Sequence, residues 1–74
     1  MMHYYLFRVH GNQFRMERAS NVREACKLAF GTIYEAPYNG SVVYKDIGTR
    51  SPKYLSNKVK QQWYKDEGWQ VIGG

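Results

Sequence analysis

The first part of the chain alternates apolar and polar residues with the period of two that is typical of β-strands. This pattern runs over residues 3–10 and again over residues 13–19. Gly11 and Asn12 separate the two runs and suit a two-residue turn, whose residues need positive φ angles. The pattern therefore predicts a β-hairpin.

A two-residue turn also fixes which residues of the hairpin face one another. Val9 then lies opposite Phe14 and Phe7 opposite Met16, so that the hairpin has one apolar face. The same register predicts that the side chains of the second face are Tyr4, Leu6, Arg8, His10, Gln13, Arg15 and Glu17.

A helix is predicted directly after the hairpin. Asn21 can cap its first turn with Glu24 three positions later, and Gly31 can end it in the left-handed conformation. One buried stripe follows from the helical spacing of Val22, Ala25, Cys26 and Ala29. We interpret Cys26 as a small core residue rather than a reactive thiol.

The second half of the chain contains three further elements. Residues 32–40 are expected to form a loop, and residues 41–47 a third strand. A second helix is predicted over residues 53–67, opened by the proline of Ser51-Pro52, and residues 69–72 form a short final strand.

The resulting order is β-β-α-β-α-β, which predicts one small α+β domain over residues 1–74. Its sheet is expected to be antiparallel or mixed, with both helices on one face. Leu55, Val59 and Trp63 repeat every four residues along the second helix, so Trp63 is assigned to the core. Trp69 suits either the core or an interface.

Composition narrows the class of protein. The 74 residues include 11 basic and 6 acidic side chains, a formal charge of +5, and 16% aromatic residues. So many aromatic residues exclude a disordered tail, and the length excludes a multi-domain enzyme. A single cysteine excludes an intramolecular disulfide and favours the cytoplasm. The longest apolar run, residues 4–7, is far shorter than a membrane span of about 20 residues, so no membrane partner is expected.

Catalytic and metal-binding patterns are missing from the sequence. His3 and His10 are the histidines, and neither falls in a spacing that builds a zinc site with Cys26. The glycines form no phosphate-binding loop. We therefore expect no enzymatic activity, no cofactor, no metal and no small-molecule substrate.

The predicted hairpin register creates a first basic surface. It places Arg8 directly opposite Arg15, with Tyr4 on the same face. Like charges in this position destabilise a sheet, which favours a fork of guanidinium groups that receives a phosphate or carboxylate. A solvated sheet face, with Glu17 balancing one arginine, is the alternative.

The predicted second helix supplies a second basic surface. From Lys45 to Lys65 the chain has six basic residues against one acid, Asp46. Such a face either keeps the protein soluble or contacts a polyanion. The candidate binding residues on this helix are Lys53, Tyr54, Lys58, Lys60 and Lys65.

Together these surfaces predict a non-enzymatic binding protein that docks a polyanionic surface. That surface is nucleic acid, or the nucleic-acid channel of a ribonucleoprotein or polymerase; arginines and lysines would contact phosphates, and tyrosines would stack. The alternative is a protein-only interaction module or inhibitor, which would use a sheet edge and a patch of Tyr64 and Trp69.

Two pattern-level resemblances bear on this prediction. Residues 5–9 (Tyr-Leu-Phe-Arg-Val), 14–17 (Phe-Arg-Met-Glu) and 19–25 (Ala-Ser-Asn-Val-Arg-Glu-Ala) are similar to the hairpin–helix–strand plan of very small phage-encoded inhibitors of host machinery. This resemblance implies stoichiometric binding of a large partner. The element order and the terminal Gly73-Gly74 also resemble a ubiquitin-like modifier.

Overall fold

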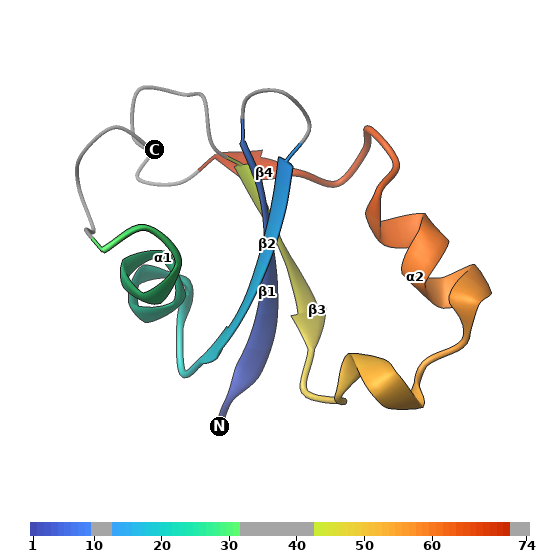
Figure 1. Cartoon of the computed structure of the whole chain (residues 1–74), viewed down its shortest axis with the longest axis horizontal. Helices are drawn as coiled ribbons and strands as arrows, with labels where there is room; N and C mark the ends of the chain where they lie inside the picture. The colour runs from blue at the N-terminus through green and yellow to red at the C-terminus, as the bar shows by residue number, and fades with distance from the viewer. Residues whose placement is uncertain (10–12, 32–42, 72–74) are drawn as a thin grey trace.

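The computed structural model describes residues 1–9, 13–31 and 43–71 (Figure 1). The elements confirm the α+β class and the predicted order. Along the chain they are β1 (His3–Val9), β2 (Gln13–Ala19), α1 (Val22–Phe30), β3 (Val43–Gly48), the short 3-10 helix η3 (Pro52–Tyr54), α2 (Asn57–Trp63) and β4 (Gln70–Val71).

The strands form one antiparallel sheet in the order β2-β1-β3-β4. β1 and β3 are central, whereas β2 and β4 lie at the edges. β1 pairs with β2 along its whole length on one side and with β3 along most of its length on the other. The loop predicted over residues 32–40 lies outside the described residues, as do the turn predicted at Gly11-Asn12 and the first part of the predicted third strand.

The predicted hairpin register is wrong by one residue. Val9 pairs with Gln13, and Arg8 pairs with Phe14, so three residues separate the strands instead of two. Because side chains alternate along a strand, a shift of one residue turns every side chain of β2 to the opposite face. Arg15 therefore pairs with Phe7 and does not face Arg8.

The two helices lie on opposite faces of the sheet, so the prediction that both cover one face is wrong (Figure 1). The reason lies in β1, where Tyr5, Leu6 and Phe7 are all buried. Consecutive residues of a strand point to opposite faces, so burial of all three requires cover on both sides.

The α1 face holds the larger apolar core. Phe7 and Cys26 are both 0% exposed, which confirms Cys26 as a core residue. The Oδ1 atom of Asn21 accepts a hydrogen bond from the Glu24 backbone N–H at 2.9 Å, and Gly31 has a φ of 77°, so both predicted helix ends are confirmed. The buried cluster consists of Tyr5, Phe7, Ala19, Ala25, Cys26 and Ala29.

The single helix predicted over residues 53–67 is wrong, because η3 and α2 are separate. Leu55 between them is extended, with φ −101° and ψ 148°. Ser56 then starts α2, since its Oγ accepts a hydrogen bond from the Val59 N–H at 3.3 Å. Trp63 is only 9% exposed, as predicted for the core, whereas Val59 is 43% exposed.

Candidate functional site

The structure separates the residues predicted for the first basic surface. Tyr4 and Arg8 lie on the α2 face of β1, whereas Arg15 lies on the α1 face of β2. There the Arg15 guanidinium lies 6.0 Å from the centroid of the Phe30 ring. Each face of the sheet is covered by a helix, so the predicted open face with a fork of Arg8 and Arg15 is wrong.

Arg8 is engaged within the fold. Its Nη1 donates a 2.7 Å hydrogen bond to Oδ1 of Asp66, and its guanidinium lies 5.8 Å from the Trp69 ring centroid. These contacts tie β1 to the segment that follows α2. Arg8 thus has a partner within the fold, and its role in binding stays a prediction.

Lys45 holds the end of α2 against the sheet. Its Nζ donates hydrogen bonds to the carbonyl oxygens of Trp63, at 2.7 Å, and Lys65, at 3.1 Å. It also lies 4.5 Å from the centroid of the Trp69 ring. Trp63 is the last residue of α2, where unpaired carbonyls carry partial negative charge, so the ammonium caps this helix end.

The environment of Lys45 shifts its titration. Burial lowers the pKa of the Lys45 ammonium below its usual value, against the opposing effect of Glu67. Arg8 lowers this pKa further and Asp66 raises it. Sequence reasoning counted Lys45 only as one charge of the basic stretch. Its position at the centre of an apolar third strand was the signal that it has a buried partner.

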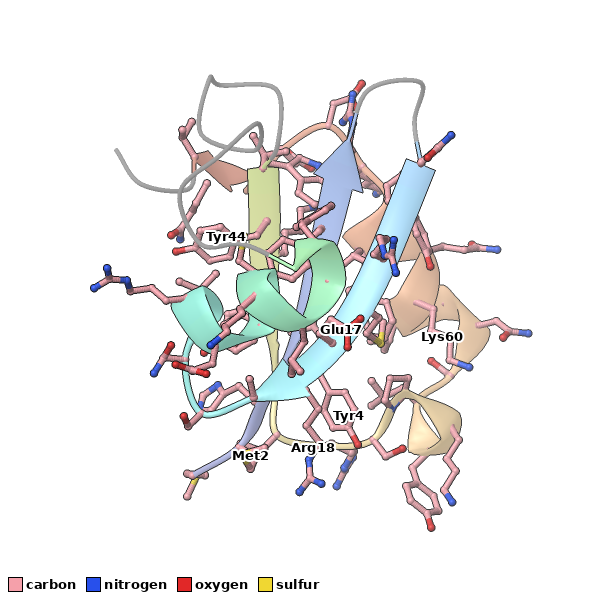
Figure 2. The ribbon with its side chains drawn as sticks, turned by 60° about the vertical axis from the view of Figure 1, so that its left-hand side comes forward. Met2, Tyr4, Glu17, Arg18, Tyr44 and Lys60 are labelled. Atoms are coloured by element: carbon pink, nitrogen blue, oxygen red, sulfur yellow. The ribbon has the colours of Figure 1, made fainter. Side chains whose placement is uncertain are left out.

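A group of cations and aromatic rings lies at the end of the sheet where β1 begins. Tyr4 pairs with Arg18 at the end of β2 and with Gly48 at the end of β3, and η3 follows shortly (Figure 2). The Arg18 guanidinium lies 5.8 Å from the Tyr4 ring centroid, and Nζ of Lys53 lies 5.2 Å from that of Tyr54.

We define the basic–aromatic surface as this group together with the remaining cations of the same segment. Residues 47–65 contain five basic side chains and no acidic one, so no carboxylate of this segment neutralises the surface. Tyr54 is 71% exposed, so its ring is accessible to a partner. Its ring contacts come from Tyr4, Arg18, Lys53 and Tyr54, and we add the neighbouring cations Arg50, Lys58 and Lys60, of which Lys58 and Lys60 lie on different sides of α2.

Five of the residues predicted from the sequence thus belong to this surface, and two members were missed. Arg18 was missed because the wrong register assigned it to the other face of β2. Arg50 belongs to the acid-free stretch but was not singled out. Lys65 lies beyond the end of α2, next to Asp66 and Glu67, and is outside the surface.

A separate aromatic patch lies near the start of β2. The ring of Phe14 meets that of Tyr64 edge to face, with centroids 4.7 Å apart, and lies 6.2 Å from that of Trp69. Phe14 and Tyr64 are 37% and 46% exposed. Trp69 is half-buried, and its Nε1 donates a 2.7 Å hydrogen bond to the carbonyl of Lys65.

An open groove of about 450 Å³ lies between β3 and the end of α2. Lys45, Gln62, Trp63 and Gln70 contribute to its lining. The charged residues of the lining are Lys45 and Asp46. Both have partners within the fold: Lys45 donates to the carbonyls of Trp63 and Lys65, and Asp46 accepts from the Gly48 N–H.

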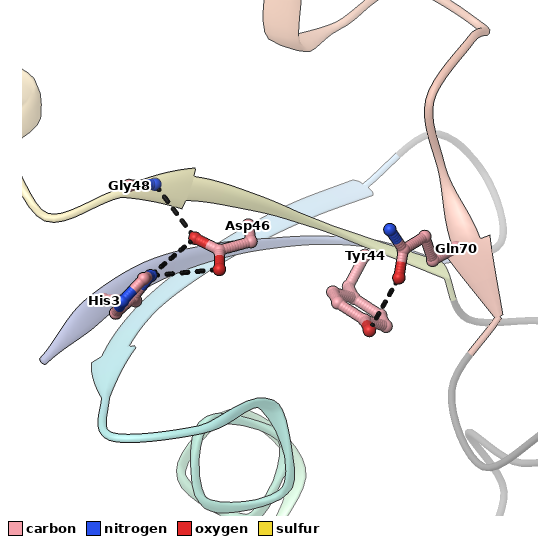
Figure 3. A network of polar contacts seen from close by, with 5 residues as sticks. All are labelled: His3, Tyr44, Asp46, Gly48 and Gln70. Carbon is pink, nitrogen blue, oxygen red and sulfur yellow. Dashed lines mark hydrogen bonds and ion pairs between the residues drawn. The ribbon is translucent and has the colours of Figure 1, made fainter. Parts of the chain in front are cut away.

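On the α1 face of the sheet, polar side-chain contacts link neighbouring strands (Figure 3). The Nδ1 atom of His3 lies 3.0 Å from both carboxylate oxygens of Asp46, and Oδ1 of Asp46 accepts a 3.0 Å bond from the Gly48 N–H. The Tyr44 hydroxyl donates to Oε1 of Gln70 at 2.9 Å. These bonds join β1 to β3 and β3 to β4.

The described residues contain neither a candidate metal site nor a helix that could span a membrane. Within residues 1–9, 13–31 and 43–71, no three His, Cys, Asp or Glu side chains gather in a way that could hold a metal ion. No helix in the same part of the chain has the length and apolar character needed to cross a membrane.

Neither the family models, nor the curated proteins, nor the solved structures contain a match to this chain.

Proposed function

We propose that the chain is a non-enzymatic, cytoplasmic binding protein that docks a polyanion through the basic–aromatic surface. Single-stranded nucleic acid, exposed by itself or in a ribonucleoprotein or polymerase channel, is the polyanion whose chemistry fits best. Binding would be stoichiometric, as the resemblance to small phage-encoded inhibitors implies.

The observation that supports this function is the juxtaposition of cations and aromatic rings at one end of the sheet. Arg18 and Lys53 each lie within 6 Å of a tyrosine ring centroid, and no acidic residue occurs from 47 to 65. Single strands are bound by this combination, because cations follow the phosphates while the bases stack on aromatic side chains.

Tyr54 is the strongest candidate for stacking. It is 71% exposed, and its ring lies 5.2 Å from Nζ of Lys53. Burial of an aromatic ring in the fold would stabilise the domain, so an exposed ring beside a lysine is better explained by contact with a partner. Base stacking contributes about 1–3 kcal/mol for each base.

Fluorescence anisotropy of labelled single- and double-stranded DNA and RNA tests the proposal. We expect the affinity for single strands to fall steeply between about 50 and 200 mM salt, because phosphate contacts release counterions. The double variant Lys53→Gln/Lys58→Gln is expected to reduce the slope of log K against log salt by about 1.4, at about 0.7 for each lost contact.

A matched control removes the same charge elsewhere. Lys27→Gln/Lys65→Gln lowers the net charge equally, but Lys27 lies on α1 and Lys65 follows α2. If this control weakens binding as much as Lys53→Gln/Lys58→Gln does, total charge and not the basic–aromatic surface is responsible. Tyr54→Ala is expected to weaken binding about tenfold without changing the salt slope.

The aromatic patch supports a second candidate, a protein-only interaction module. Phe14 and Tyr64 leave part of their rings exposed beside Trp69, and aromatic anchors are enriched in protein interfaces. This function predicts no nucleic-acid binding at low salt, together with capture of a protein partner that is lost in Tyr64→Ala. The modifier resemblance stays a prediction, because Gly73 and Gly74 lie outside the described residues.

A further inference from the structure

The outer edge of β2 is the longest unpaired strand edge in the described part of the sheet. β2 spans seven residues, Gln13–Ala19, and pairs only with β1. The other edge strand, β4, has two residues. In Figure 1 β2 lies in front of the sheet, with α1 and α2 to either side and no described element across its edge.

An exposed edge strand offers a row of backbone donors and acceptors to another strand. Proteins commonly protect such an edge with charged side chains. β2 carries Arg18 on one face and, on the other, two opposite charges two residues apart, Arg15 and Glu17. This pattern repels an approaching copy in some registers and attracts it in one.

We infer that β2 pairs with β2 of a second copy of this chain, forming a two-fold dimer with one continuous antiparallel sheet. A two-fold axis normal to the sheet places one residue opposite its own counterpart, and the other pairs follow from it. The choice of register therefore reduces to which residue of β2 lies on the axis.

Charge selects Met16 as the residue on the axis. With Met16 there, Arg15 lies opposite Glu17 of the second copy, and symmetry repeats this pair. An axis at Arg15 or at Glu17 places two like charges opposite each other instead. Met16 is also the midpoint of Gln13–Ala19, so this register pairs all seven residues of the strand.

The side chains on the opposite face of β2, Phe14, Met16 and Arg18, are also compatible with this register. Phe14 then lies opposite Arg18 of the second copy, a cation beside a ring that is 37% exposed in the single chain. The two Met16 side chains, each half-buried in the single chain, meet at the axis. Apolar contact thus lies at the centre of the interface, and the charged pairs flank it.

Sedimentation velocity of the full chain over a range of concentrations tests the dimer. Arg15→Glu or Glu17→Arg alone is expected to weaken dimerisation about tenfold or more, because each puts two like-charged pairs across the axis. The double variant Arg15→Glu/Glu17→Arg exchanges the partners and is expected to restore the affinity to within about threefold.

Controls separate the interface from general charge and from folding. Lys27→Glu makes the same charge change on α1 and is expected to leave dimerisation unchanged. Thermal melts of the single variants show whether the monomer remains folded. A chain that stays monomeric up to about 1 mM, or a double variant that is not restored, overturns the inference.

Oxidation of cysteine variants tests the register itself. Met16→Cys is expected to form a disulfide-linked dimer, since opposed Cβ atoms lie about 4.5–5.5 Å apart. Gln13→Cys is the control, because its counterpart would lie at the far end of the paired strands. Efficient linkage through residue 13 but not through residue 16 would contradict the proposed register.

Discussion

The two faces of the sheet are held by different kinds of contact. On the α1 face, Phe7 packs against small buried side chains of the helix and meets Phe30 edge to face at 5.5 Å. On the α2 face, Leu6 and Trp63 are buried, but the helix end is fastened by the ammonium of Lys45. The α1 face thus supplies apolar packing, whereas the α2 face combines a smaller core with polar bonds.

This difference assigns separate tasks to the faces. A short helix with little apolar contact leaves most of its side chains exposed, and α2 together with η3 carries most of the basic–aromatic surface. Residues that must meet a partner cannot also be buried in the core. We therefore expect the α1 face to contribute most of the stability, whereas the α2 side carries most of the surface that we propose for binding.

The strongest test of this contrast is Phe7→Ala. Phe7 is 0% exposed and lies at the centre of the α1 face, so its loss is expected to cost about 3–5 kcal/mol of unfolding free energy. Urea denaturation measures this change, with Val59→Ala on α2 as a control of little expected effect. A cost below about 1 kcal/mol would show that the α1 core does not dominate stability.

A smaller and local effect is expected from Lys45→Met on the other face. The change removes two hydrogen bonds from a charged donor, and we expect a loss of about 1–2 kcal/mol because the group is only partly buried. Hydrogen exchange should become faster in α2 and stay unchanged in α1. Equal acceleration in both helices would mean that the two faces unfold as one unit.

The bond between Arg8 and Asp66 is expected to contribute less. Asp66 is 88% exposed, so water screens the pair and its coupling should lie below about 1 kcal/mol. A double-mutant cycle with Arg8→Met and Asp66→Asn measures this coupling. A coupling free energy above about 1 kcal/mol would show that the segment after α2 is a main support of the α2 face.

A dependence of stability on alkaline pH is expected from Tyr5 on the α1 face. Burial raises the pKa of its phenol above the ordinary value of 10.0, and Asp46 and Tyr44 act in the same direction. The folded state therefore favours the neutral phenol. Its contribution to stability is complete below pH 10 and is lost as the pH rises through the folded-state pKa.

Alkaline urea titrations of the wild type and Tyr5→Phe measure this contribution. The two proteins should differ in the slope of stability against pH above pH 10 and agree in slope below it. Identical slopes throughout would show that Tyr5 titrates alike in the folded and unfolded states.

Local signals in the sequence were enough for the elements that depend on neighbouring residues. The cap at Asn21, the glycine at Gly31 and the stripe through Cys26 lie within a few turns of one helix, and the structure confirms all three. The α+β class and the order of elements follow from the same local periodicity. The acid-free stretch from 47 to 65 is also a property of the chain alone.

Tertiary structure decided what depends on distant partners. The hairpin register differs by one residue from the one that Gly11-Asn12 suggested, and this shift alone separates Arg15 from Arg8 and brings Arg18 to Tyr4. Local spacing cannot show that Lys45 caps the end of α2, because its partners lie 18 and 20 residues away in the chain. Burial of β1 on both faces places the helices on opposite sides and so determines which charges reach the surface; the unbroken apolar run of residues 4–7 was the local sign of it, but the run does not say which helix covers which face.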